Sequence, residues 1–507
     1  MRSSHEGRLP VLRLICLTAA ALVIHGYHLG VEDGEIYVPG ARRLLHPHLY
    51  PFAPQFFLAQ THLSIFSSIL AWTTRLTHLS MDWTMFAWYV VSLFGLLVAG
   101  WLFAVACFSS SRARWTAIVV LTAVLAMPVA DTALLLIDPY LTARSFSTPL
   151  TLFALASFLE RRYARTVAAM LVMAAIHPLM VVYLLALIGI TLVAERRKKR
   201  MPNPVAVPVS ALAIGIMPAG FHLAPATGPY REVLFSRDYF FLYNWTWYHW
   251  LGLLGPLAIL AFFWKANLRG TRPAFRRISF ALVPFGLVSI LVAGILCSSP
   301  EFEMFLRLQP LRSFHVITLA FVILFAGILG EYLAKDRPWV IAALCLPLAV
   351  GMFIVARATY PNSPQIELPS ATSSNPWVNA LLWIRSNTPR DAVFAVDSRY
   401  FRDPIGDSHG FRALSERSAL ADYYKDSGVV ALFPTLAPEW KQMTNATYGL
   451  NHFTLKQFQY LRTEYPRISW TVIHGPAPNG MDCPYQRQSY SVCRMPPLPP
   501  GATALQQ

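Results

Sequence analysis

Long apolar stretches recur along this chain, and short clusters of arginine and lysine separate them. Several stretches are long enough for a helix to cross the hydrocarbon core of a bilayer, which is about 30 Å thick and needs ~20 apolar residues. The composition agrees, because 55% of the residues are hydrophobic and only 13% are charged. A soluble domain cannot bury that much apolar side chain. The sequence therefore predicts a mainly helical polytopic membrane protein with about 11 membrane segments.

The formal net charge of +16 does not indicate a nucleic-acid partner. The basic residues form short clusters between apolar stretches instead of one continuous stripe, and such clusters are typical of cytoplasmic loops. Arg2, Arg8 and Arg13 are also typical of the start of a signal peptide. No small-residue cleavage site follows the first apolar stretch, so we expect that stretch to remain as a helix.

The basic clusters predict the orientation of the chain. They lie at residues 112–114, 161–165, 196–200, 265–277 and 335–337, and we expect them on the cytoplasmic side. The N-terminus is then cytoplasmic and the C-terminal tail is outside. The predicted spans are residues 11–28, 82–108, 116–137, 146–159, 205–223, 251–264, 278–297, 314–333 and 339–355.

Two further apolar segments do not fit this alternation. A crossing at residues 55–77 would place every later basic cluster on the wrong side, so we expect this segment to lie along the outer surface or to dip in and out. Residues 167–194 have basic clusters at both ends and are broken at Ile176-His177-Pro178. Each leg of about 14 residues rises only about 21 Å, which predicts a short hairpin with His177 at its tip. At that depth His177 is either a satisfied structural residue or a functional one.

Three acids, Glu32, Asp33 and Glu35, follow the first apolar stretch, and Arg42 and Arg43 come shortly after them. A carboxylate at the edge of a bilayer can be partly desolvated, which raises its basicity, and neighbouring arginines can bind a phosphate. This combination is typical of catalysis on a lipid-linked substrate. The other interpretation is a solvated loop that ends a membrane helix.

The outer side of the predicted membrane domain carries arginine but no lysine. Arginine has a planar fork of donors that binds phosphate oxygens in pairs, and it stays protonated at membrane depth. Arg144 lies between prolines in DPYLTARSFSTP, and Arg312 lies in a second group, FLRLQPLRSFH. For any single arginine the alternative is contact with lipid headgroups. The predicted phosphate-binding set is Arg42, Arg43, Arg144, His177 and Arg312.

The composition changes near residue 359. Prolines, serines and threonines in residues 359–374 predict a linker. Asn375-Pro376 then predicts the start of a helix, and DAVFAVDS, RISWTVIHG and YSVCRM predict strands. We therefore expect a membrane domain at residues 1–358, the linker, and a small extracytoplasmic α/β domain at residues 375–507.

Two cysteines, Cys483 and Cys493, enclose CPYQRQSYSVC near the C-terminal end. This spacing can close a hairpin disulfide in an oxidising compartment. The chain has no CxxC pair, HExxH, Walker loop or GxGxxG motif, so metal hydrolysis, ATP-driven transport and dinucleotide chemistry have no sequence basis. We predict no cofactor and no metal site, although acids such as these would accept a divalent metal.

Several segments carry a resemblance to a known family. EDGEIYVPGARRLLHPHLYPFAPQFF, DPYLTARSFSTP, AAIHPLM, LFSRDYFFLYNWTWYHWLGLL and RLQPLRSFH resemble a family of uncharacterised bacterial multi-pass membrane proteins, which in turn resembles the GT-C glycosyltransferase superfamily. GT-C enzymes use polyprenyl-phosphate-linked sugars, carry a catalytic acid in the first outer loop and have a C-terminal outer domain. Asp33 matches that acid best. The usual Asp-Glu pair is replaced here by Glu32-Asp33, with Glu35 nearby, so the identity of the base stays open.

The resemblance implies an inverting glycosyltransferase in the bacterial inner membrane. Its partners would be a polyprenyl-phosphate-linked sugar, membrane lipid, and a glycan, lipid or protein acceptor. Asp33, or else Glu32 or Glu35, would act as the base. The alternatives are a secondary transporter, which the absence of a clear internal repeat disfavours, an outer-leaflet glycan ligase, and a non-catalytic assembly subunit.

Overall fold

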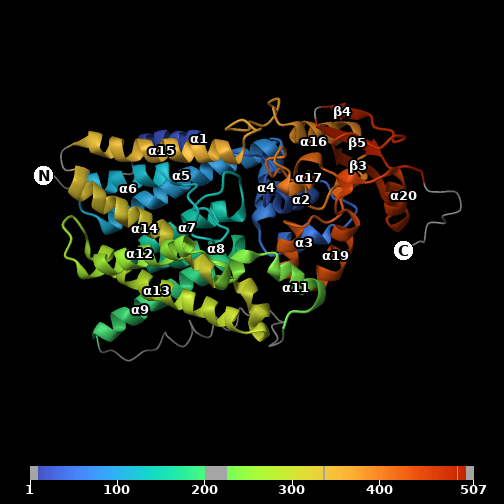
Figure 1. Ribbon diagram of the computed structural model, residues 1–507. Helices are drawn as coiled ribbons and strands as arrows, with labels where there is room; N and C mark the ends of the chain where they lie inside the picture. The colour runs from blue at the N-terminus through green and yellow to red at the C-terminus, as the bar shows by residue number, and fades with distance from the viewer. Residues whose placement is uncertain (1–9, 200–224, 335–336, 488, 498–507) are drawn as a thin grey trace. The chain divides into compact units, whose positions relative to one another are not determined.

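The computed structural model describes residues 10–199, 225–334, 337–487 and 489–497. These residues are mainly helical, with a small sheet near the C-terminus (Figure 1). The chain forms two compact units. Unit 1 comprises Met1–Gly26, Ala87–Ala226 and Leu234–Ala356, and unit 2 comprises Tyr27–Phe86, Thr227–Val233 and Arg357–Gln507. The predicted fold class, a mainly helical membrane protein with a small α/β part, is confirmed, whereas the domain boundaries at residues 358 and 375 stay a prediction.

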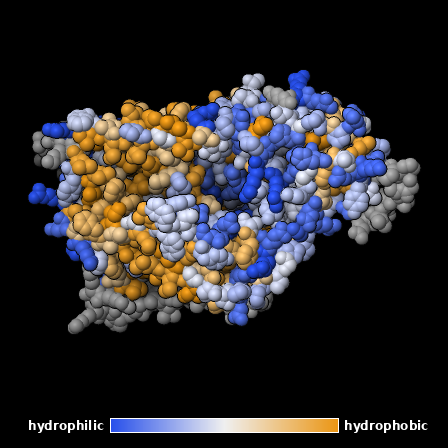
Figure 2. All heavy atoms as spheres, in the orientation of Figure 1, coloured by the Kyte–Doolittle hydropathy of each residue, from blue (hydrophilic) through white to orange (hydrophobic). Residues whose placement is uncertain are grey.

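The helices of unit 1 are mostly long and apolar. They are α1 (Val11–His25), α5 (Met81–Cys107), α6 (Ser111–Ala123), α7 (Ala143–Leu159), α8 (Tyr163–Ile176), α9 (Pro178–Lys199), α12 (Trp247–Lys265), α13 (Pro273–Ser298), α14 (Phe314–Leu329) and α15 (Pro338–Thr359). Within the described ranges, six segments are long and apolar enough to cross a membrane. Hydrophobic side chains cover much of the surface of unit 1 in Figure 2. Only 6% of the most apolar part of α15 is buried by protein, so lipid is the environment that its side chains require.

Local signals predicted most of these helices but not all of their ends. The predicted span at residues 116–137 is wrong beyond Ala123, where α6 ends. Residues 124–142 are irregular, because Pro128 and Pro139 disfavour helix at and before their positions. The span predicted at residues 205–223 lies outside the described residues.

The predicted breaks in the two unusual segments are present. Helix α8 ends at Ile176 and α9 begins at Pro178, with His177 between them. The second leg of the predicted hairpin is longer than expected, since α9 continues for 22 residues through a helix-favouring run of Glu, Arg and Lys. Residues 55–77 form α3 (Gln55–Thr61) and α4 (Phe66–Thr77). Neither is long enough to cross a bilayer, as expected for a segment that does not span.

Close helix packing holds unit 1 together. Helices α6 and α14 pack against each other, as do α7 with α8 and α12 with α13. Gly327 of α14 shows how closely its neighbours approach, because a Cβ atom at this position would lie 2.3 Å from the ring of Phe108. Small residues at such contacts allow helices to approach closely in lipid, where packing replaces the hydrophobic effect as the driving force.

Unit 2 contains a five-stranded sheet with the order β2-β1-β3-β5-β4. The strands are β1 (Val393–Ala395), β2 (Ser418–Ala419), β3 (Ile468–His474), β4 (Tyr485–Arg487) and β5 (Tyr490–Arg494). Strand β1 pairs in parallel with β2 and β3, whereas β5 pairs antiparallel with β3 and β4. The other elements of unit 2 are α2 (Gly34–Leu45), α3, α4, most of α11 (Gly228–Phe235), α16 (Pro376–Asn387), α17 (Phe411–Ser415), α18 (Asp426–Leu432), α19 (Ala437–Ala446) and α20 (Leu455–Glu464).

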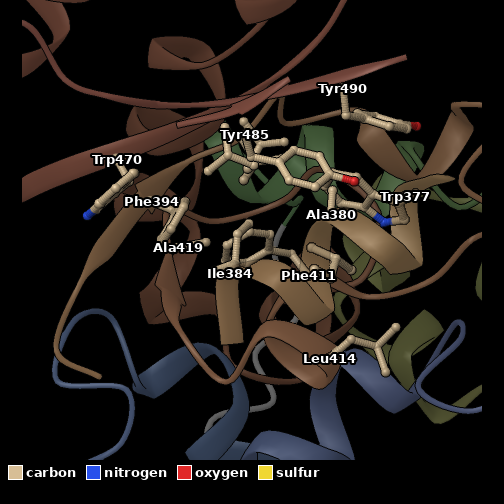
Figure 3. Close-up of a cluster of buried hydrophobic side chains, with 14 of the residues drawn as sticks. Trp377, Ala380, Ile384, Phe394, Phe411, Leu414, Ala419, Trp470, Tyr485 and Tyr490 are labelled. Carbon is tan, nitrogen blue, oxygen red and sulfur yellow. The ribbon is translucent and has the colours of Figure 1, made fainter. Parts of the chain in front are cut away.

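The core of unit 2 lies between α16 and the sheet, where Trp377, Phe394, Phe411 and Trp470 belong to one buried cluster (Figure 3). A capping residue, Asn375, marks the start of α16. The Asn375 side chain accepts hydrogen bonds from the backbone N–H groups of Trp377 at 2.9 Å and of residue 378 at 3.2 Å. Such a cap satisfies donors that would otherwise be buried without partners.

The structure pairs Cys483 with Cys493 in a disulfide, across a sequence separation of 10 residues. We expect both thiols to resist alkylation in freshly isolated membranes until reductant is added. Loss of the bridge in a Cys483→Ala/Cys493→Ala variant should lower the free energy of unfolding by about 2–3 kcal/mol, because the closed loop is short. Thermal unfolding of the purified protein measures this loss. Free thiols before reduction would contradict both the bridge and the outer location of this domain.

Candidate active site

The three acids of the first loop lie at the start of helix α2. Asp33 directly precedes the helix, and Glu35 is in its first turn. The segment is therefore helical from Gly34 onward instead of being a loop. A carboxylate at a helix N-terminus interacts favourably with the helix dipole. The Asp33 side chain is 28% exposed, so it is accessible to solvent.

Lys425 is the positively charged partner of Glu32 and Asp33. Its ammonium contacts a carboxylate oxygen of Glu32 and lies 3.3 Å from Oδ1 of Asp33. No spacing rule predicts this contact, because Lys425 is 392 positions from Asp33. Lys425 can hold the two acids in place and balance their charge.

Glu35 differs from the other two acids because it is buried. Its carboxylate accepts hydrogen bonds from the Arg412 backbone N–H at 3.0 Å, the Arg412 Nε at 2.7 Å and the Ala413 backbone N–H at 3.0 Å. Burial raises the pKa of Glu35, and Arg412 opposes that shift. Gly410 makes room for the carboxylate, since a Cβ atom there would lie 2.3 Å from Glu35 Oε2. These contacts are typical of a structural acid.

The same arginine binds two more buried acids. One terminal nitrogen of Arg412 (Nη2) lies 2.5 Å from Asp426 Oδ1 and 3.4 Å from Asp422 Oδ2. All four side chains are at most 3% exposed. Burial raises the pKa of Asp422 and of Asp426, and the positive charge of Arg412 limits the shift. Glu35, Arg412, Asp422 and Asp426, here called the Arg412 cluster, thus anchor the first turn of α2 to α17 and α18.

The arginines of α2 also have protein partners. Arg42 lies 2.5 Å from Asp82 and 3.4 Å from Glu416, and Arg43 donates to the Tyr50 carbonyl at 2.6 Å. The opposite charges leave Arg42 less available for a phosphate. The predicted role of Arg42 and Arg43 in phosphate binding stays a prediction.

In unit 1 three helices begin at predicted phosphate-binding residues. Arg144 is the second residue of α7, His177 directly precedes α9, and Arg312 lies two residues before α14. Arg144 and Arg312 lie close enough to act electrostatically on the rings of both His177 and His315. We call Arg144, His177, Arg312 and His315 the basic cluster. It gathers two arginines and two histidines beside helix N-termini, which are themselves suited to anions.

Fixed contacts position the members of the basic cluster. Asp138 accepts hydrogen bonds from Arg144 Nη2 at 2.7 Å and Nε at 3.2 Å. Arg312 lies in the short helix η4 (Pro310–Ser313), which follows Gln309 in a left-handed conformation with φ of 49°. The hydroxyl of Tyr183 in α9 contacts the carbonyl oxygens of Leu308 at 2.9 Å and Gln309 at 2.8 Å, which holds this turn beside α9.

Some polar atoms near Arg312 lack partners. Arg312 Nε, Gln309 Oε1 and Ser313 Oγ are buried and make no hydrogen bond within the described residues. A buried polar group without a partner is costly, and a ligand is one way to satisfy it. Gln309 and Arg312 also line a small pocket, together with Thr132, Tyr239, Phe240, Ala293, Leu306, Pro310 and Leu311.

The described residues contain no group of three or more His, Cys, Asp or Glu side chains placed to hold a metal ion. Asp33, a half-buried carboxylate, belongs to unit 2, and the basic cluster belongs to unit 1. Sequence reasoning missed Asp82 and Arg412, which contact α2, and Lys425, which contacts the acids just before it; all three are distant in the chain from their partners.

A second buried ion pair in unit 2 makes its stability depend on pH. Both ring nitrogens of His409 face acceptors, the Gly406 carbonyl at 2.9 Å and the Glu367 carboxylate at 2.9 Å. Burial by itself lowers the pKa of His409, but Glu367 outweighs burial and raises it. Burial by itself raises the pKa of Glu367, but His409 and His28 lower it.

We expect this pair to be fully stabilising between about pH 4.3 and pH 6.5, the ordinary pKa values of Glu and His. Above that window the folded protein keeps a proton on His409 that the unfolded chain loses, so stability falls as pH rises. Below that window Glu367 binds a proton in the unfolded chain but stays ionised in the folded protein, so stability falls again as pH is lowered. The thermal midpoint against pH measures this. His409→Asn should flatten the alkaline decline, whereas His48→Asn, at an exposed position of unit 2, should leave it unchanged. An unchanged decline in His409→Asn would contradict the assignment.

No protein-family model and no curated protein match the chain. The structure is similar to the crystal structure of ArnT from Cupriavidus metallidurans in the apo state, with 12% identity and a TM-score of 0.38 over 95% of this chain and 97% of that chain.

Proposed function

We propose that this protein is an inverting membrane glycosyltransferase that moves a sugar from a polyprenyl-phosphate donor to an acceptor at the outer face of the inner membrane. The observation that carries the proposal is the basic cluster. Arg144, His177 and Arg312 are far apart in the sequence, yet each lies at a helix N-terminus, and within unit 1 both arginines act electrostatically on the His177 ring. A phosphate is the ligand that such a group fits best.

The acids supply the second half of the chemistry. Asp33 takes the proton from an acceptor hydroxyl while the hydroxyl oxygen attacks the anomeric carbon of the sugar. The bond between that carbon and the phosphate oxygen breaks, its electron pair leaves with the polyprenyl phosphate, and the configuration is inverted. The basic cluster stabilises the charge that develops on the phosphate, which is where fixed positive groups give the largest gain. Glu35 serves to fix α2, because its carboxylate is bound by the Arg412 side chain and by the Ala413 backbone N–H.

The arginine forks are the first test of this proposal. Arg144→Lys and Arg312→Lys keep the charge but lose the paired donors, so each should weaken binding of polyprenyl phosphate about tenfold or more. The measurement is the affinity of the purified full chain in nanodiscs for polyprenyl phosphate without sugar. Arg161→Lys is the matched control, because Arg161 is an exposed arginine of unit 1, and it should bind as the wild type does. Equal affinity in all three variants would show that the basic cluster does not bind the donor phosphate.

One observation favours a second candidate function. Lys425 contacts Glu32 and Asp33, and Arg412 holds Glu35, so each acid of the first loop has a cationic partner. Paired acids are typical of a structural element, which fits a non-catalytic subunit that binds a polyprenyl phosphate and assists a partner enzyme. In that case the arginine variants would lose polyprenyl-phosphate binding while removal of the Asp33 charge would change no reaction rate.

A further inference from the structure

Two exposed arginines of unit 2 contact the rings of nearby tyrosines. The guanidinium carbon of Arg399 lies 4.9 Å from the ring centre of Tyr423 and 4.7 Å from that of Tyr448. The guanidinium carbon of Arg402 lies 4.9 Å from the ring centre of Tyr424. The rings of Tyr423 and Tyr424 also contact each other, with centroids 5.3 Å apart. These five residues form one continuous group, here called the arginine–tyrosine array.

The guanidinium groups of the array keep their hydrogen-bond donors. Within the described part of the chain, neither Arg399 nor Arg402 forms an ion pair. The acids nearest to them in the sequence have other donors: Asp397 accepts from the Arg399 backbone N–H at 2.9 Å, and Asp403 accepts from the Tyr490 hydroxyl at 2.7 Å. A guanidinium over an aromatic face is restrained by the ring, and its planar fork of donors stays available to a pair of oxygens. Both arginines are therefore suited to bind an oxyanion.

Backbone contacts fix the tyrosines of the array. The Tyr423 backbone N–H donates to the Ser398 carbonyl at 2.8 Å. The backbone N–H groups of Tyr424 and Lys425 donate to Oδ1 of the buried Asp422, at 2.8 Å and 2.6 Å. The segment that carries the two rings is thus attached to the buried part of unit 2. A surface that is ordered before a ligand arrives loses less entropy when it binds.

The array lies next to the proposed base. Lys425 directly follows Tyr424 in the chain, and its ammonium lies 3.3 Å from Oδ1 of Asp33. The same ammonium lies 5.9 Å from the ring centre of Phe401, the residue before Arg402. Two short segments of unit 2 therefore bring the array and the half-buried Asp33 together. A ligand that contacts Arg402 can reach Asp33 without leaving this surface.

The charge around the array limits the class of ligand. Glu32 and Asp33 contact Lys425, and Asp397 lies two positions before Arg399, so acids surround the two arginines. A phosphate monoester carries nearly two negative charges at neutral pH and a carboxylate carries one, so a phosphate meets more repulsion here. The 58% exposed ring of Tyr448 adds a rigid apolar face to the array. A carboxylate on a sugar ring matches both features.

We infer that the arginine–tyrosine array binds an acidic glycan, with Arg399 and Arg402 binding carboxylates of its uronic acid units and the Tyr448 ring packing on a sugar face. The inference rests on the proposed function in one respect: the glycan bound beside Asp33 is the acceptor, and one of its hydroxyl groups is the group that Asp33 deprotonates. The carboxylates themselves take no part in the transfer and serve to position the acceptor.

Calorimetric titration of the full-length chain in phosphatidylcholine nanodiscs tests the site. The probes are tetragalacturonate and tetramannuronate, each compared with its methyl ester, which has the same shape without the charge. At least one acid should bind, and its ester should bind about tenfold more weakly or less well still. Arg399→Gln and Arg402→Gln should each weaken that binding about tenfold, since each removes a charged donor group. Arg487→Gln, at an exposed arginine of unit 2 outside the array, is the matched control and should bind as the wild type does.

Three outcomes would overturn the inference: no binding of either acid to the wild type, equal binding by the three arginine variants, or esters that bind as well as the acids. Displacement of the bound acid by glycerophosphoglycerol at a lower concentration than by methyl galactosiduronate would also overturn it and would indicate a lipid headgroup site. Thermal midpoints show whether a loss of binding reflects misfolding.

The same titration of Asp33→Asn separates this inference from the proposed function. That variant should bind the acid at least as tightly as the wild type does, because it removes a like charge beside the array. Binding to the wild type together with a native transfer rate in Asp33→Asn would keep the glycan site and refute the proposed base. Absence of binding would refute the glycan site whatever that rate is.

Discussion

Replacing Asp33 with asparagine is expected to lower glycosyl transfer from a polyprenyl-phosphate sugar by about 100-fold or more. Asparagine keeps the shape of the side chain but cannot take up the proton of the acceptor hydroxyl, and general-base catalysis contributes about 10²–10⁴-fold. The exposed fraction of Asp33, 28%, makes this substitution compatible with folding. The measurement is release of free polyprenyl phosphate from a labelled donor in native membranes, which supply the acceptor without requiring that it be identified.

Glu32→Gln is the matched control for Asp33→Asn. Both acids contact Lys425, so both variants disturb the same ammonium group, but only one removes the proposed base. Glu32→Gln should therefore lower the rate only modestly. A large loss of rate in Glu32→Gln, together with a native rate in Asp33→Asn, would assign the role of general base to Glu32. Native rates in both variants, with polyprenyl phosphate still bound, would favour the non-catalytic subunit.

The apolar helices and their breaks were predictable because their causes are local. The length of α5 and the break at His177 between α8 and α9 follow from neighbouring residues alone. The apolar composition of residues 116–137 predicts a longer helix than the one present, because α6 ends at Ala123 and Pro128 disfavours helix in the residues before it.

The partners of the candidate site could not be predicted in the same way. Glu35 meets Arg412 across 377 positions of sequence, and no spacing rule links such distant residues. The sequence indicated that Glu32, Asp33 and Glu35 were unusual as a group. It could not separate the half-buried Asp33 from the buried Glu35, since burial is a property of the folded chain. The basic cluster was more accessible to prediction, because proline and helix-start signals mark the surroundings of Arg144, His177 and Arg312.

The Arg412 cluster should carry the largest stability effect in unit 2. Arg412→Met fills a similar volume but leaves Glu35, Asp422 and Asp426 buried without their cation. Removing one partner of a buried ion pair typically destabilises a protein by about 3–5 kcal/mol. The thermal midpoint of the purified chain should fall accordingly at neutral pH. Arg494→Met is the matched control, because Arg494 pairs with Asp482 at the surface and both side chains are 63% exposed. That variant should change the midpoint little.

The pH dependence of Arg412→Met distinguishes a charge effect from a packing effect. Burial raises the pKa of all three carboxyl groups, so the folded protein binds protons that the unfolded chain releases above about pH 4. Stability then falls as pH rises, and loss of Arg412 strengthens this trend because the opposing positive charge is gone. The destabilisation relative to wild type should therefore shrink as pH is lowered from 7 toward about 4.5, where the carboxyl groups can be neutral. A loss that is the same at both pH values would assign the role of Arg412 to packing, and a wild-type midpoint at pH 7 would show that the cluster does not anchor α2.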